Sequence, residues 1–191
     1  MIDRLRTLRP LTLLAVLVAS LGCAGMGNVY LDSTMDFGAL QNVAVMPFQD
    51  LTQEEDAAPR VRDTFMGMLL ATEAVYVVPA GEVSRGIARV GMRDPATPTT
   101  EEVKRLSGIL GVQGVFTGVL REYGTVRSGS ATASVVSLSL QLIEVETGTV
   151  VWSAASTKGG ITVVDRLLGG GGEPMNDVTV DVVNDLLDKL F

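Results

Sequence analysis

The sequence predicts an α/β domain of the α+β kind: a single mixed β-sheet with a parallel β-α-β start, a C-terminal antiparallel meander and helices packed on the sheet. Two observations predict this fold class. In the first half of the chain, short apolar runs flank a stretch with helical periodicity, and the order strand, helix, strand favours a right-handed parallel crossover. In the second half, apolar and polar residues alternate along successive segments, which is typical of half-buried antiparallel strands.

The first predicted strand lies in NVAVMPFQD, residues 42–50, where Val43 and Val45 belong to a compact apolar run that a proline ends. The segment APRVRDTFMGMLLAT, residues 58–72, then follows a helical period, and Pro59 suits the first turn of a helix. The side chains expected on one face of this helix are Val61, Phe65, Met68, Leu69 and Thr72.

A second short strand is predicted in AVYVVPAG, residues 74–81, and a short helix in AGEVSRGIARVG, residues 80–91. Glu102 follows Thr99 by three residues, at the start of the apolar periodicity of EVKRLSGILG, residues 102–111. This spacing is that of a capping box, in which each side chain binds the backbone N–H of the other residue. We therefore expect a helix to begin here.

Three segments of the second half predict the meander. GVQGVFTGVLREYG, residues 111–124, supplies the first strand, and the turn sequence ETGT, residues 146–149, joins the other two. Alternation along the middle strand makes one of its faces apolar and the other polar. Its predicted buried residues are Val136, Leu138, Leu140 and Leu142, and its predicted exposed residues are Ser137, Ser139 and Gln141. Along the third strand, Val150, Trp152 and Ala154 alternate in the same way.

The last segment, PMNDVTVDVVNDLLDKLF, residues 174–191, predicts an amphipathic helix that closes the sheet. Its apolar stripe consists of Val178, Val182, Leu186 and Leu190, and its acidic residues Asp177, Asp181, Asp185 and Asp188 lie largely off that stripe.

The N-terminus has the pattern of a secretory signal. MIDRLRTLRP carries three arginines, and an almost uninterrupted apolar run from Leu11 to Leu21 follows it and ends at the small residue Gly22. A helix needs about 20 apolar residues to cross a bilayer, and this run is too short. We therefore predict a signal peptide at residues 1–22 that is cleaved rather than retained as a membrane span.

The only cysteine, Cys23, directly follows this signal. It cannot form an internal disulfide, and the sequence contains no histidine to join it in metal binding or nucleophilic catalysis. The pentapeptide ASLGC resembles the bacterial lipobox, in which the cysteine is lipidated and becomes the mature N-terminus, although Ser20 stands where a leucine is usual. The alternative is an ordinary secretory signal with an incidental Cys23.

The chain thus divides into a lipoprotein signal peptide, residues 1–22, a lipidated flexible tether, residues 23–39, and a periplasmic domain, residues 40–191. Removal of the signal takes away three arginines and one aspartate, which leaves 12 basic and 21 acidic residues and a net charge of −9. Such a surface repels nucleic acid and anionic lipids, so we expect no nucleic-acid partner and a membrane attachment through acyl chains on Cys23.

No catalytic, cofactor-binding or metal-ligating residue is predicted. The run GGGG, residues 169–172, lacks the following lysine and hydroxyl residue of a phosphate-binding loop and is interpreted as a flexible loop. The acidic run at residues 54–56 is interpreted as solvated surface, because a calcium site needs more oxygens at fixed spacing. Trp152 is expected to pack in the core rather than to act as a binding anchor. We therefore expect a protein that is not an enzyme.

Three segments together resemble an envelope lipoprotein group: NVAVMPFQDLTQ, GVQGVFTGVLREYG and VSLSLQLIEVETGTVVWSAAST. This group comprises the penicillin-binding protein activator LpoB, the curli secretion lipoprotein CsgG and the N-terminal domain of TolB. The resemblance covers roughly residues 40–160. It implies a compact α/β domain, non-enzymatic, that works through protein contacts in the periplasm.

A pore of the CsgG kind would need membrane-spanning hairpins inserted into this domain, each with two strands of about 9–11 residues. The two places for them are residues 124–134, which we consider too short for a hairpin, and residues 157–174, where only ITVV resembles a strand. A channel is therefore disfavoured.

Two functions remain open. The first is an interaction module that binds or regulates an envelope machine, either a peptidoglycan synthase or a secretion or assembly complex. The alternative is a structural, ring-forming subunit of an outer-membrane export assembly, and thus a homo-oligomer. Ala24 stands where an aspartate retains enterobacterial lipoproteins in the inner membrane, so we expect an outer-membrane anchor with the domain on the periplasmic face.

Overall fold

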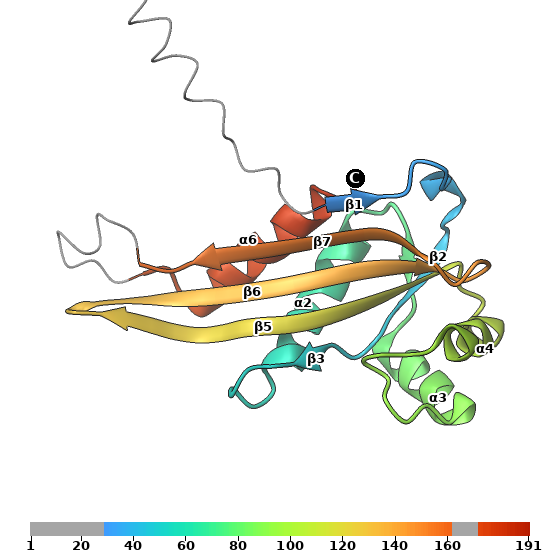
Figure 1. Ribbon diagram of the computed structural model, residues 1–191, viewed down its shortest axis with the longest axis horizontal. Helices are drawn as coiled ribbons and strands as arrows, with labels where there is room; N and C mark the ends of the chain where they lie inside the picture. Colours follow the sequence, from blue (N-terminus) through green and yellow to red (C-terminus); the bar gives the residue numbers. More distant parts are fainter. Residues whose placement is uncertain (1–28, 162–171) are drawn as a thin grey trace, which may run out of the picture.

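A computed structural model describes residues 29–161 and 172–191, and within them one mixed sheet carries helices on both faces (Figure 1). The strands are β1 (Val29–Leu31), β2 (Asn42–Val45), β3 (Gln49–Asp50), β4 (Tyr76–Val77), β5 (Gly114–Ser128), β6 (Ala131–Glu144) and β7 (Val150–Gly159). The helices are α2 (Ala57–Ala71), α3 (Ala80–Val90), α4 (Thr100–Leu110) and α6 (Met175–Leu187), and η2 (Phe37–Ala39) is a short 3-10 turn.

The strand order is β1-β7-β6-β5-β2-β4, and β3 pairs with β5 beyond the end of β2. β2 is parallel to both β4 and β5, and α2 connects β2 and β3 to β4. β5, β6 and β7 pair antiparallel in sequence order. The predicted fold class is therefore confirmed, with the parallel β-α-β unit at one side of the sheet and the meander at the other.

One face of the sheet holds the larger core. Helices α2 and α6 cover it, and Phe65 of α2 packs edge-on against Phe116 of β5, with ring centroids 5.3 Å apart. Phe116 in turn packs against Trp152, which is fully buried and donates its indole N–H to the carbonyl oxygen of Lys189 at 3.0 Å. Trp152 is thus a core residue, as its alternation predicts.

The alternation along β6 holds for its apolar positions. All four leucine and valine residues predicted to be buried are at most 1% exposed. On the opposite face Gln141 is exposed and Ser139 half-buried, but Ser137 is buried, contrary to our expectation. The reason is local, because the Ser137 hydroxyl shares a hydrogen bond of 2.8 Å with Thr157 Oγ1 on the neighbouring strand.

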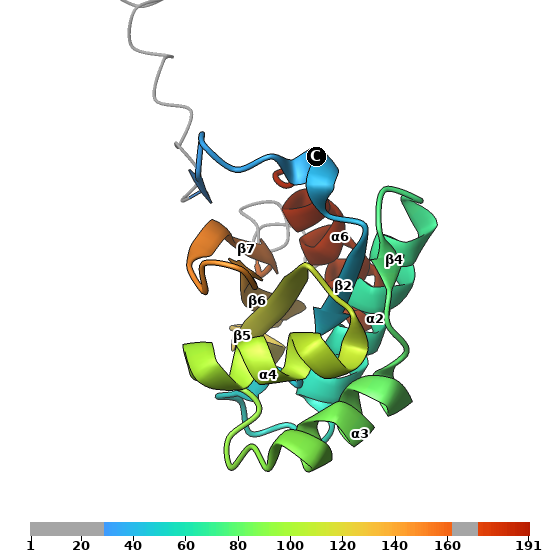
Figure 2. The same cartoon turned by 90° about the vertical axis from the view of Figure 1, so that its right-hand side faces the viewer.

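Helices α3 and α4 cover only one end of the second face (Figure 2). Their buried residues Val83, Val103 and Leu106 pack on Ala44 and Val115 of the sheet. The α4 capping box is present as predicted, and both helices end at glycines in the left-handed conformation. The rest of this sheet face, toward the far end of β5, β6 and β7, carries no helix within the described residues.

The structure differs from the sequence analysis before residue 40. We expected a flexible tether over residues 23–39, but residues 29–31 form β1, which pairs antiparallel with β7 from Val29 opposite Ala154 to Leu31 opposite Trp152. The Asp32 N–H extends this pairing to the carbonyl oxygen of Val151. The free edge of β7 offers backbone groups that need partners, and the N-terminal chain supplies them.

The hairpin of β5 and β6 is also longer than expected. Residues 124–134 are not too short for a hairpin, because the strands on both sides continue through them to a two-residue turn at Gly129, where φ is +63°. Figure 1 shows this hairpin extending beyond the helices as a two-stranded arm. In the other segment considered for an insertion, β7 ends at Gly159, and residues 162–171 lie outside the described residues.

Candidate functional site: an open sheet face

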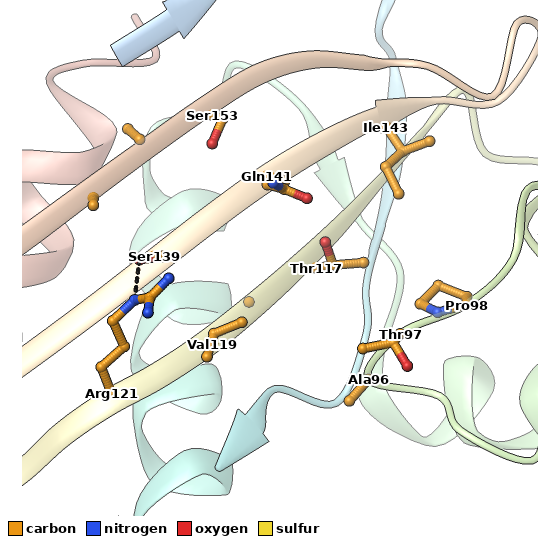
Figure 3. Close-up of a pocket in the computed structure, with 13 residues that line it drawn as sticks. Ala96, Thr97, Pro98, Thr117, Val119, Arg121, Ser139, Gln141, Ile143 and Ser153 are labelled. Carbon is orange, nitrogen blue, oxygen red and sulfur yellow. Dashed lines mark hydrogen bonds between the residues drawn. The ribbon is translucent and has the colours of Figure 1, made fainter. Parts of the chain in front are cut away.

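The uncovered part of the second sheet face forms a shallow groove of about 480 Å³ (Figure 3). Side chains from three strands form its floor, and the α3–α4 loop forms one rim. The lining residues are Ala96, Thr97, Pro98, Thr117, Gly118, Val119, Arg121, Ser139, Gln141, Ile143, Ser153, Ala154 and Ala155.

The strand register places a row of side chains with polar groups across this floor. Thr117 pairs with Gln141, Gln141 pairs with Ser153, and Ser153 pairs with Tyr30 of β1. Directly paired residues of antiparallel strands lie on the same face, so these four side chains form one row that ends at the sheet edge. Where the floor residues are short, at Gly118, Ser139 and Ser153, the backbone of a bound molecule can approach the sheet closely.

Arg121 stands at one end of the groove and, among residues 29–161 and 172–191, is the only charged residue that lines it. Leu120 pairs with Leu138 and Glu122 with Ser137, so Arg121 is the extra residue of a β-bulge. Its Nε–H donates to Ser139 Oγ at 3.0 Å (Figure 3), which holds the guanidinium over the groove face. A β-bulge commonly re-aims a side chain in this way.

Hydrogen bonds hold the rim loop in place. Thr97 Oγ1 donates to Asp94 Oδ2 at 2.5 Å, and the Ala96 N–H donates to Asp94 Oδ1 at 3.1 Å. These bonds hold the pKa of Asp94 below its ordinary value, and the bond from the Thr97 hydroxyl has the largest effect. Next along the chain, the backbone and hydroxyl of Thr99 donate to Glu102 and lower the pKa of Glu102. Both carboxylates therefore stay ionised well below neutral pH.

The predicted lipidation site, Cys23, lies outside the described residues, so its acylation stays a prediction. The acidic residues at 54–56 lie at the start of α2 and are exposed, as interpreted from the sequence. In the described part of the chain, no group of three histidine, cysteine or acidic residues is placed to hold a metal ion. No helix among residues 29–161 and 172–191 combines the length and apolarity of a membrane span.

The sequence matches the GNA1162-like lipoprotein family over residues 37–187, which is most of the chain. The chain belongs to this lipoprotein family. The resemblance to an envelope lipoprotein group is thereby confirmed at the level of the family, and the likeness to CsgG and TolB stays a prediction. Among curated protein sequences, none matches this chain.

Solved structures with this fold include two that cover most of the chain. A PelC dodecamer from Paraburkholderia phytofirmans is 18% identical, with a TM-score of 0.58, over 86% of this chain and 98% of the PelC chain. Lipoprotein GNA1162 from Neisseria meningitidis is 21% identical, with a TM-score of 0.54, over 78% of this chain and 99% of that one. An NMR structure of E. coli LpoB is 18% identical, with a TM-score of 0.48, over 63% of this chain and 60% of the LpoB chain. At these identities the likeness to PelC and GNA1162 shows the fold alone.

Proposed function

We propose that this family member is a lipid-anchored, non-enzymatic lipoprotein whose domain binds a protein of the cell envelope through the open sheet face. The observation that carries the proposal is the groove around Arg121 and Gln141, a part of the sheet that no helix covers within the described residues and that presents both polar and apolar side chains. The partner belongs to an envelope machine, either a peptidoglycan synthase or a secretion or assembly complex.

The chemistry of the groove suits a polypeptide. Its hydroxyls and the Gln141 amide can donate and accept hydrogen bonds, as the backbone of an extended segment requires. Arg121 adds a planar donor group of the kind that is enriched at interface hot spots, and it suits a carboxylate of the partner. Strands β5, β6 and β7 form a rigid floor, so little conformational entropy is lost on binding.

The proposal is tested by charge reversal with a matched control. Arg121→Glu places a carboxylate in the groove, whereas Arg127→Glu makes the same change on the exposed arm of the same strand. We expect chemical cross-linking in native envelopes, followed by mass spectrometry, to recover a partner with the wild-type chain and with Arg127→Glu. Arg121→Glu, folded as judged by circular dichroism, should lose it. Equal recovery with all three chains would show that the groove does not bind the partner.

A second candidate function is that of a ring-forming structural subunit of an outer-membrane export assembly. It is favoured by the likeness of the fold to PelC, which forms a dodecamer. Size-exclusion chromatography with light scattering on the chain without its acyl group separates the two candidates. A mass of many subunits supports the ring, and a monomer supports the interaction module.

We further propose that the protein is held on the periplasmic face of the outer membrane, because Ala24 rather than aspartate follows Cys23. Sucrose-gradient fractionation of envelopes should place the chain with outer-membrane markers. Co-migration with inner-membrane markers would contradict this location.

A further inference from the structure

Strand β1 exposes three consecutive apolar side chains at the edge of the sheet. Val29 is 40% exposed, Tyr30 52% and Leu31 53%. Single apolar residues on a protein surface are ordinary, but a run of them on an edge strand is a template for unwanted pairing that native proteins usually cover. Within the described residues β1 has one partner strand, β7, and its other edge is free. We therefore expect another protein or a membrane to cover β1.

The length of chain before β1 favours a membrane. Five residues, 24–28, separate Cys23 from Val29. Even a fully extended chain spans at most about 3.6 Å per residue, so Val29 lies within about 22 Å of Cys23. If Cys23 carries acyl chains, as the proposed function has it, the bilayer surface is always within this reach of β1.

The side chains of β1 suit the headgroup layer. Tyr30 is on the groove side of the sheet, opposite Ser153, whereas Val29 and Leu31 are on the core side, so apolar surface flanks the sheet edge on both sides. Tyrosine is enriched at membrane–water interfaces, where its ring is apolar and its hydroxyl is hydrated. The free backbone groups of the edge need water or polar partners, which the headgroup layer offers and the hydrocarbon core does not.

Charge selects the kind of lipid. Asp32 directly follows β1, and hydrogen bonds from the hydroxyl and backbone of Thr34 lower the pKa of Asp32, so its carboxylate is ionised. This carboxylate, in a chain with excess acid, disfavours anionic headgroups. Contact through apolar side chains with zwitterionic headgroups carries no such cost.

We propose that β1 is a membrane-contact strand, in which Val29, Tyr30 and Leu31 rest in the zwitterionic headgroup layer of the bilayer that holds the acyl chains of Cys23. The inference rests on the proposed lipid anchor and adds to it an orientation. The domain does not move freely on a tether but approaches the membrane by the β1 edge of its sheet.

The test uses two matched tyrosines at opposite edges of the sheet. Tyr30 lies on β1 and Tyr76, which is 55% exposed, lies on β4. Acylation blocks the thiol of Cys23, so Tyr30→Cys or Tyr76→Cys gives the lipidated full chain one reactive thiol for an environment-sensitive fluorophore. Each labelled chain is reconstituted into phosphatidylethanolamine–phosphatidylcholine vesicles with or without headgroup-nitroxide lipid.

We expect the label at position 30 to shift its emission to the blue in vesicles and to be quenched several-fold more strongly by the nitroxide lipid than the label at position 76. Equal emission and quenching at both positions, in chains that sediment with the vesicles, would overturn the inference and leave the anchor intact. A wild-type chain that takes up label at Cys23 and stays in the supernatant would instead overturn the anchor. A label at position 30 that is already shielded in detergent, without vesicles, would show that protein covers β1 and would also overturn the inference.

Discussion

Leucine and serine side chains that alternate along β6 have opposite surroundings. Leu140 is fully buried in the core under α2 and α6, whereas the next residue along, Ser139, is half-buried on the groove floor. The Ser139 hydroxyl accepts one hydrogen bond, from the exposed side chain of Arg121. The two positions therefore differ mainly in the apolar surface that each one removes from water.

This difference gives the first prediction. Leu140→Ala removes buried methyl groups and leaves a cavity, which typically costs about 2–5 kcal/mol, a large part of an ordinary domain stability of about 5–15 kcal/mol. Ser139→Ala loses one exposed hydrogen bond, which costs about 1 kcal/mol or less. Thermal unfolding followed by circular dichroism should show a much lower Tm for Leu140→Ala. Equal melting of the two variants would mean that the register of β6 is wrong.

A second prediction concerns Asp185, which joins α6 to β7. Its carboxylate accepts from Lys189 Nζ at 2.5 Å and from Lys158 Nζ at 3.1 Å. Burial by itself would raise the pKa of Asp185. The hydrogen bonds to its carboxylate outweigh this effect and lower the pKa to about 2, and the bond from Lys189 contributes most to the lowering. Because the folded-state pKa lies below the unfolded one, Asp185 stabilises the fold above about pH 4 and loses this contribution as the pH falls toward 2.

We therefore expect Asp185→Asn to lower the free energy of unfolding at pH 7 by about 1–2 kcal/mol once solvent screening is allowed for. The difference from the wild type should shrink as the pH falls from about 4 to 2. Urea unfolding at several pH values measures it, with Asp181→Asn, an exposed position on the same helix, as the control. If the loss of unfolding free energy in Asp185→Asn did not change with pH, packing rather than charge would explain it.

Among the elements, β5 carries two glycines with different surroundings. A Cβ on Gly118 would lie 2.6 Å from Phe48 Cδ1 and 2.8 Å from Leu140 Cδ2, whereas a Cβ on Gly124 would meet nothing within 4 Å. Neither glycine has a positive φ, so the comparison concerns space alone. At Gly118 the absence of a side chain lets Phe48 pack on the sheet, next to Phe65.

We expect Gly118→Ala to destabilise the domain by about 1–3 kcal/mol, as overpacked cores do. Gly124→Ala should leave stability unchanged or raise it by up to about 1 kcal/mol, because alanine restricts the unfolded chain. Urea unfolding of both variants measures the difference. If Gly124→Ala were the more destabilised variant, the two positions on β5 would have been assigned to the wrong environments.

The elements that the sequence predicts are those whose evidence is local. The α4 capping box needs only Thr99 and Glu102, and the burial of Leu140 follows from alternation within one strand. β1 escaped prediction because three residues cannot show a period, and their partner strand lies far along the chain. The length of the β5–β6 arm was missed because the apolar residues at its tip, Ala131 and Ala133, are small and give only a weak alternation, although they are buried and the strands continue through them.

The candidate site was predictable only in part. Alternation placed Ser139 and Gln141 on the polar face of β6, which is the floor of the groove. Two features had no local signal: α3 and α4 cover only one end of that face, and a bulge places Arg121 over it. A bulge is a difference in length between paired strands, so neither strand shows it alone.

For the domain as a whole, the two proposed surfaces are adjacent. Tyr30 belongs to β1 and also ends the row of side chains that crosses the groove floor through Ser153 and Gln141. A bilayer at β1 would therefore border the groove, and a partner bound there would lie close to the membrane. This arrangement favours a partner that is itself anchored in the same membrane over one that diffuses through the periplasm.

The last prediction concerns the anchor on which both surfaces depend. Cys23→Ala removes the only thiol, and because position 23 precedes every element of the described fold, the domain should unfold at the same Tm as the wild-type chain. Cells that produce the wild-type chain with a radiolabelled fatty acid should incorporate label into it, and the chain should sediment with membranes. The Cys23→Ala chain should carry no label, because it has no thiol to which an acyl chain could be attached. Equal incorporation of label in both chains would refute lipidation at Cys23, and a lower Tm of the variant would show that residues before β1 contribute to the fold.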